Sequence, residues 1–69
     1  MSLIKRSLSL DGHATSVALE PEFWAVLDSA AVRHQQSLAS LIGQIDSSRG
    51  ATPLASAIRV WALQQAKPR

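Results

Sequence analysis

The chain has 69 residues and a mass of 7.4 kDa, which is enough for one small domain, and its formal net charge is +2. It contains no cysteine, and none of its apolar runs approaches the roughly 20 residues of a membrane-spanning helix. Disulfide frameworks, thiolate metal sites and membrane spans are therefore excluded, and a cytoplasmic bacterial protein is expected. Chains this short expose much of their surface, so we expect a homodimer without a stable folded monomer.

Two segments near the start of the sequence alternate polar and apolar residues, which predicts strands at about 6–10 and 14–19. Asp11-Gly12 lies between them and is a strong signal for a two-residue hairpin turn. In the second strand, the residues on the inward face are Thr15, Val17 and Leu19. The residues on its outward face are Ala14, Ser16 and Ala18.

Three helices are predicted after the strands, at about 21–34, 37–48 and 53–65. Pro21 suits a first helical position, and Ser37 is a candidate N-cap. The second helix carries the clearest apolar stripe: Leu38, Leu41, Ile42 and Ile45. The third helix has apolar residues on two opposite sides. His34 falls on the apolar stripe of the first helix, so we expect it to be partly buried and hydrogen-bonded.

Few residues of this chain point to catalysis. His13 and His34 are its two imidazoles, and none of the common nucleophile, metal or phosphate-binding motifs is present. We therefore expect no enzymatic activity, no cofactor and no metal site. Trp24 and Trp61 lie on or beside apolar helix faces, so core packing is the favoured interpretation over stacking on a base or ligand. Arg59, in the middle of a helix, is also interpreted as structural.

The order of strand, helix and helix resembles the ribbon-helix-helix family of bacterial and phage DNA-binding proteins. The resemblance covers about residues 6–63 and is strongest to a small bacterial subfamily with an extra C-terminal helix. It is carried by Gly12-His13, Thr15-Ser16-Val17, Leu19-Glu20-Pro21-Glu22-Phe23-Trp24, Ser37-Leu38, Leu41-Ile42, Ile45-Asp46 and Leu54-Ala55-Ser56-Ala57-Ile58-Arg59-Val60. It implies a mainly α fold with a short β-ribbon: a single domain over 1–69, forming a ribbon-helix-helix dimer with a third C-terminal helix. The predicted strand at 6–10 would add an N-terminal β-hairpin.

The resemblance also implies a DNA-binding site, because in this family a two-stranded ribbon enters the major groove. Residues at the base-reading positions are Ala14, Ser16 and Ala18. The N-terminus of the second helix would bind a backbone phosphate, through Ser37, Leu38 and Ala39. Lys5 and Arg6 would approach phosphates as an N-terminal arm.

This sequence departs from the family at two places. Close relatives tend to carry arginine at the positions of Ala14 and Ala18, and alanine makes no hydrogen bond to a base. The glycine that usually separates the first two helices is also absent, with Gln35 near that place. Two functions therefore remain open: a homodimeric transcriptional regulator that binds double-stranded DNA, and an adaptor that binds a protein partner through the third helix.

Overall fold

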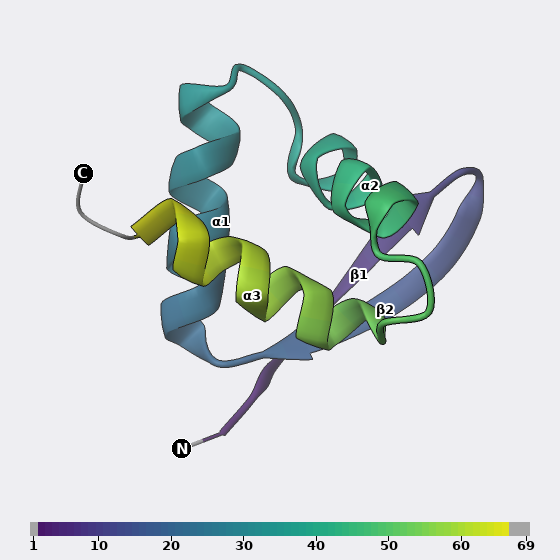
Figure 1. Cartoon of the computed structure of the whole chain (residues 1–69), viewed down its shortest axis with the longest axis horizontal. Helices are drawn as coiled ribbons and strands as arrows, with labels where there is room; N and C mark the ends of the chain where they lie inside the picture. Colours follow the sequence, from purple (N-terminus) through teal and green to yellow (C-terminus); the bar gives the residue numbers. More distant parts are fainter. Residues whose placement is uncertain (1, 67–69) are drawn as a thin grey trace.

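A computed structural model describes residues 2–66 of the chain. Two antiparallel strands are followed by three helices, and the first and last described residues lie on different sides of the molecule (Figure 1). The elements are β1 (Ile4–Leu10), β2 (His13–Leu19), α1 (Pro21–Arg33), α2 (Leu38–Ser48) and α3 (Leu54–Ala66). The predicted fold class, mainly helical with a short β-ribbon and an extra C-terminal helix, is confirmed.

The β1–β2 hairpin closes through the two-residue turn that the sequence predicts. Asp11 and Gly12 both have positive φ values, 51° and 79°, as a type I′ turn requires. The register runs from Leu10 opposite His13 to Ile4 opposite Leu19, so all seven residues of each strand are paired. Strand β1 therefore begins two residues before the predicted start, and the described ribbon is formed within one chain.

Helix α1 begins with Pro21 and ends in a Schellman motif. The N–H of Gln36 donates to the carbonyl of Ala31, and that of Gln35 to the carbonyl of Val32, both at 3.1 Å. Gln35 adopts a φ of 54°, the left-handed conformation that this motif demands. The chain turns outward here and leaves His34 exposed, so the prediction that His34 is partly buried is wrong.

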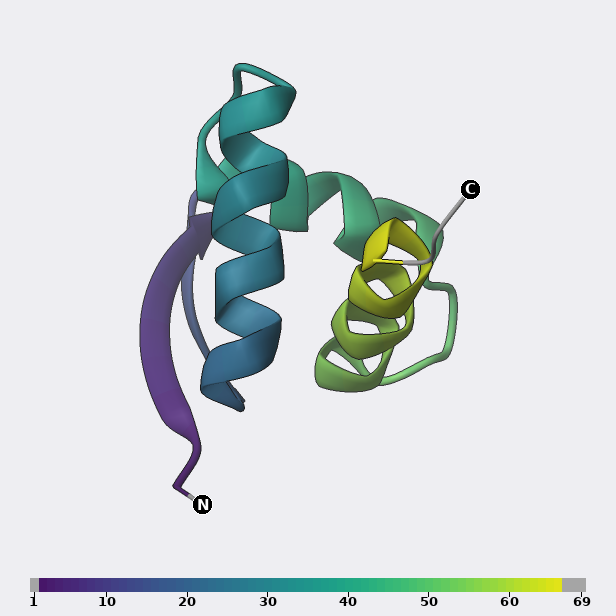
Figure 2. The same cartoon turned by 90° about the vertical axis from the view of Figure 1, so that its left-hand side faces the viewer.

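Helices α2 and α3 pack against the hairpin and α1 to complete the fold. The Ser37 hydroxyl accepts a hydrogen bond from the N–H of Ser40 at 3.0 Å, which confirms the predicted N-cap of α2. In the view of Figure 2 the hairpin runs along one side of the molecule and α3 lies on the opposite side, beyond α1. None of the described helices is long and apolar enough to span a membrane.

The core closes within a single chain, which the shortness of the chain did not lead us to expect. Leu19, Leu27, Ile42 and Ile58 are all 0% exposed, and Trp24 is 1% exposed. These residues come from β2 and from each of the three helices. The hairpin and α3 thus supply apolar surface that we expected from a second chain.

Candidate nucleic-acid interface

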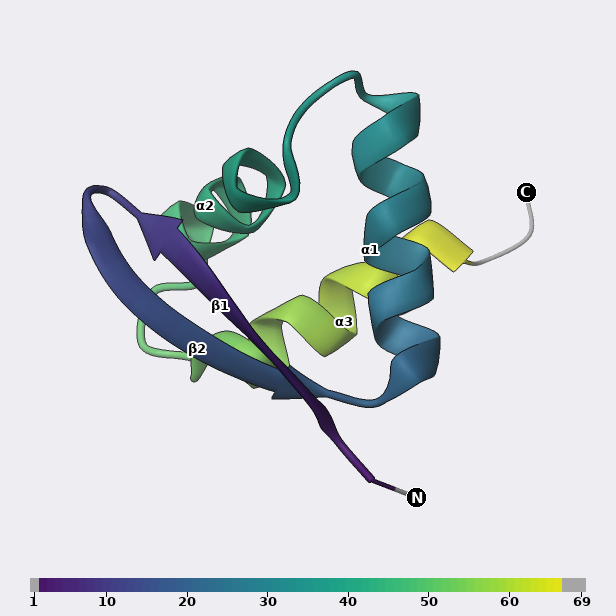
Figure 3. The same ribbon diagram turned by 180° about the vertical axis from the view of Figure 1, so that it is seen from behind.

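The outward face of the hairpin is an uncovered surface made by both strands. Seen from behind, the hairpin lies in the foreground with the helices beyond it (Figure 3). Side chains alternate across each strand, and the register places three outward pairs side by side. These pairs, here called the ribbon face, are Lys5 with Ala18, Ser7 with Ser16, and Ser9 with Ala14.

The ribbon face is composed of short side chains and one long cation. Ser7 and Ser16 lie directly opposite each other and are exposed, so their hydroxyls form the polar centre of the surface. A hydroxyl both donates and accepts a hydrogen bond. Ala14 and Ala18 offer only methyl groups, which suit contact with a thymine methyl. Sequence analysis missed Ser7 and Ser9, although alternation along β1 places them on this face.

The structure separates Lys5 from Arg6, which were predicted to act together. Lys5 is exposed on the ribbon face, whereas Arg6 is on the side of the hairpin that faces the helices. The guanidinium of Arg6 donates two hydrogen bonds to the Asp28 carboxylate, at 3.0 and 3.2 Å. Its Cζ atom also lies 4.5 Å from the ring centroid of Trp24, a cation–π distance. Arg6 thus joins β1 to α1.

Trp24 strengthens the same junction from the helix side. Its side chain is buried, and its indole N–H donates to the carbonyl oxygen of Ile4 at 2.7 Å. The favoured interpretation of Trp24 as a core residue is confirmed. Trp61 packs against the core but remains partly exposed.

The N-terminus of α2 lies beside the tip of the hairpin. A shallow groove brings the tip residues Ser9, Leu10 and Asp11 together with Ala39 and Ser40 of α2. The first N–H groups of a helix have no hydrogen-bond partner within the helix. In α2, the N–H of Ser40 donates instead to the Ser37 hydroxyl. The N–H groups of Leu38 and Ala39, at the predicted phosphate-binding positions, make no protein hydrogen bond in the described part of the chain.

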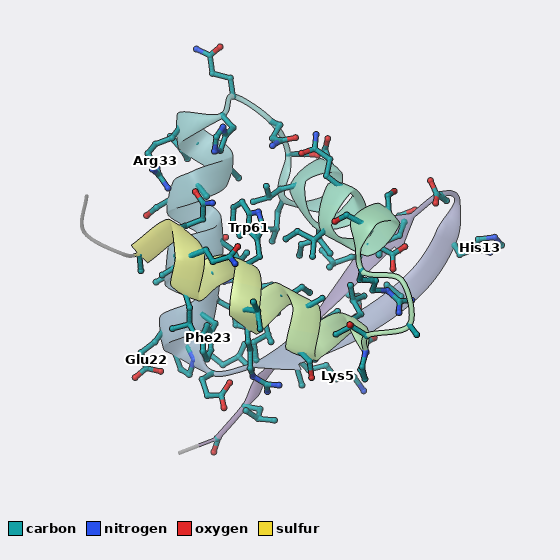
Figure 4. The ribbon with its side chains drawn as sticks, in the orientation of Figure 1. Lys5, His13, Glu22, Phe23, Arg33 and Trp61 are labelled. Atoms are coloured by element: carbon teal, nitrogen blue, oxygen red, sulfur yellow. The ribbon has the colours of Figure 1, made fainter. Side chains whose placement is uncertain are left out.

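The remaining arginines of the described helices differ in their pairing. Arg59 donates to the Glu20 carboxylate at 3.1 Å, which confirms its structural interpretation, and Arg49 donates to Asp46 at 2.6 Å. Arg33 is exposed on α1, away from the hairpin (Figure 4). Arg49 and Arg59 are thus paired with carboxylates, whereas Lys5 is exposed on the ribbon face and available to a polyanion.

The Glu20–Arg59 pair joins the end of β2 to α3. A hydrogen bond with its own backbone and a second from the Arg59 guanidinium lower the pKa of Glu20 below the ordinary value of 4.5. Both side chains are about one third exposed, so solvent screens their attraction. This pair fixes the chain where the ribbon ends and α1 begins.

Across residues 2–66, no three side chains among His, Asp and Glu come together as a metal site would require. His13 projects from the hairpin tip into solvent (Figure 4).

The chain matches the sequence model of a known family. The sequence model described as "Ribbon-helix-helix domain" matches residues 3–66, which is nearly the whole chain. Neither the curated proteins nor the solved structures contain a significant match.

Proposed function

The chain belongs to the ribbon-helix-helix family, and from this premise we propose that it is a DNA-binding transcription regulator that acts as a homodimer. Domains of this family are typically regulatory modules that form dimers and bind DNA, rather than enzymes. The observation that supports the proposal best is the uncovered ribbon face, whose side chains are short apart from that of Lys5 and include no carboxylate. We accordingly assign the protein no catalytic role.

The ribbon face enters the major groove in this proposal. The groove is roughly 12 Å wide and admits a two-stranded ribbon. Ser16 reads a base edge through its hydroxyl, while Ala14 and Ala18 contact the groove through their methyl groups. Alanine provides little discrimination between bases, so specificity is lower than that of a ribbon with arginine at these positions, where a bidentate contact contributes about 1–3 kcal/mol.

Phosphate contacts position the ribbon. The free N–H groups of Leu38 and Ala39 lie at the positive end of the α2 dipole, which favours a bound phosphate. The groove between α2 and the hairpin tip supports this role, because both elements then meet the same DNA duplex. Lys5 adds a cation near the far end of the ribbon. Arg6 contributes by holding β1 against α1, since its guanidinium is paired with Asp28.

The experiment introduces arginine on the ribbon face. Ala14→Arg is suited to this test because Ala14 is exposed and lies opposite Ser9, whereas Ala18 lies opposite Lys5 and would place two cations together. The matched control is Ala25→Arg, which adds the same charge at an exposed position of α1. Fluorescence anisotropy with duplex DNA should show tighter binding and a steeper salt dependence for Ala14→Arg than for the control. Equal effects of both variants would contradict the proposed ribbon contact.

A protein-binding adaptor is the second candidate. Val60 and Leu63, on the outer face of α3, are 54% and 57% exposed, and their side chains are large and apolar. A shallow pocket beside Val60 is also lined by Ile45 and Trp61. Failure of wild type and Ala14→Arg to bind duplex DNA at low salt, with both proteins folded, would favour this candidate.

A further inference from the structure

We infer that the shallow pocket between α2 and α3 is a binding site for a small aromatic molecule that carries a carboxylate. The pocket lies where the end of α2 meets the connecting loop and α3, and its volume is about 320 Å³. Pockets that hold small ligands have volumes of roughly 300–1,000 Å³, so this pocket suits a molecule of one or two rings. The pocket shares no residue with the ribbon face, so the inference does not depend on DNA binding.

Part of the pocket lining is apolar and includes an aromatic ring. It consists of Ile45 from α2 and of Ala57, Val60 and Trp61 from α3. Ile45 is buried in the core, whereas Trp61 packs against the core and stays partly exposed. Aliphatic side chains beside a flat aromatic one are a typical lining for a planar apolar ligand. The apolar lining therefore favours an aromatic ring.

The other lining residues are polar, and Arg49 is the charged residue among them. Ser48, Thr52 and Gln64 make up the rest of this polar part. The Nε atom of Arg49 donates to the Asp46 carboxylate at 2.6 Å, and its Nη1 atom donates to the carbonyl oxygen of Thr52 at 2.7 Å. These two bonds fix the guanidinium against the loop. Within residues 2–66, no protein group accepts a hydrogen bond from its Nη2 atom.

The free N–H groups of Arg49 indicate which polar group the ligand carries. A guanidinium is always charged, and its planar N–H groups match the geometry of a carboxylate. Asp46 offsets part of this charge from outside the pocket, and no carboxylate lines the pocket itself. The groove beside the hairpin tip has a similar volume, about 340 Å³, but Asp11 lines it and no aromatic side chain does. The pocket at Arg49 is therefore the better match for an aromatic acid.

Three probes that share an indole ring test the site: indoleacetate is an anion, indoleacetamide is neutral and tryptamine is a cation. Binding is followed by NMR through the side-chain N–H signals of the two tryptophans. Trp61 lines the pocket, whereas Trp24 is buried and donates its indole N–H to the carbonyl of Ile4, so Trp24 is an internal control.

We expect a saturable shift of the Trp61 signal and little change at Trp24. The dissociation constant should be roughly fivefold lower for indoleacetate than for indoleacetamide, because a hydrogen bond to a charged acceptor is stronger. Tryptamine should bind most weakly, since its ammonium group is repelled by Arg49. Equal dissociation constants for the three probes would overturn the assignment of a carboxylate ligand. Equal shifts at both tryptophans, or no saturable shift at Trp61, would overturn the site.

Arg49→Gln tests the partner of the carboxylate. This variant should raise the dissociation constant of indoleacetate to that of indoleacetamide and leave binding of the amide nearly unchanged. A purely structural role of Arg49 would weaken both probes alike. The matched control, Arg33→Gln, removes an equal charge from an exposed position on α1 and should keep the preference for the acid. A preference that survives in Arg49→Gln would contradict the contact with the guanidinium.

Ala57→Phe tests the apolar part of the pocket. The larger ring fills the pocket, so all three probes should lose their effect on the Trp61 signal. The matched control, Leu63→Phe, introduces the same ring at an exposed position of α3 outside the lining and should still bind. An unchanged Trp24 signal shows that a variant is folded, and if Ala57→Phe does not fold, Arg49→Gln decides. Equal weakening by both phenylalanine variants would indicate a contact spread over the face of α3, as a protein partner makes, and would overturn the pocket.

Discussion

Gln35 occupies a backbone position whose positive φ favours glycine. The Schellman motif at the end of α1 requires a left-handed residue at this position, and glycine adopts that conformation without steric cost. The family that the sequence resembles usually has a glycine near the position of Gln35. The positive φ at this position explains why glycine would fit there without strain. The sequence did not predict this motif, because glutamine gives no signal for the end of a helix.

Gln35→Gly should therefore raise the free energy of unfolding by about 1 kcal/mol, because it removes the strain of a side chain at φ 54°. Urea unfolding followed by circular dichroism measures this as a higher midpoint with an unchanged slope. Gln36→Gly, one residue later, is the control and should not stabilise the protein. A lower midpoint for Gln35→Gly would show that the side chain makes a contact worth more than the strain.

The pKa of Glu20 predicts how stability depends on pH. Its pKa is lower in the folded chain than the ordinary 4.5, so its contribution is complete above about pH 4.5 and is lost as the pH falls through the folded value. Glu20→Gln should be less stable than wild type at neutral pH, and the difference should shrink as the solution is acidified. Urea titrations at several pH values test this. A difference that stays constant with pH would contradict an ionic role for Glu20.

At the scale of single elements, the hairpin was the most predictable part of the chain. The Asp-Gly turn and the alternation that follows it depend on neighbouring residues, so local sequence is sufficient. The additional pairing of Ile4 and Lys5 was not predictable, because it depends on Trp24 and Asp28 of α1, about 20 residues away. Because Asp28 is equally far from Arg6 in the sequence, their ion pair was not predicted, and Arg6 was grouped with Lys5 as a phosphate-binding arm.

Helix α2 offers a direct test of the core. Leu41 is 2% exposed at the centre of the apolar stripe, so Leu41→Ala should lower the free energy of unfolding by about 2–5 kcal/mol. That is a large share of the total for a domain of this size, and the variant should be partly unfolded without denaturant. Gln44→Ala, an exposed position on the same helix, should change stability little. Similar values for the two variants would be inconsistent with this placement of α2.

At the scale of the whole molecule, the main difference between sequence and structure is how the core is closed. The shortness of the chain favoured an obligate dimer, because chain length cannot show which elements cover one another. In the structure, α3 lies across α1 and α2, and Ile58 is completely buried in a single chain. The ribbon face, by contrast, followed from alternation alone for the half contributed by β2.

The proposed homodimer, if it is made of independently folded chains, has a measurable consequence. On dilution, the protein should dissociate while its circular dichroism spectrum stays folded, because the core of each chain remains closed. Sedimentation velocity and circular dichroism over the same concentration range test this. Loss of structure that coincides with dissociation would instead support the obligate dimer that the short chain led us to expect.

The most direct test of the claim that the ribbon face binds DNA is an electrophoretic mobility shift of the wild-type protein with short random-sequence duplexes at two salt concentrations. We expect a retarded complex at low salt that weakens markedly at the higher concentration, because phosphate contacts supply most of the affinity of a ribbon face with few base contacts. No retarded complex at low salt, from protein that circular dichroism shows to be folded, would contradict the claim.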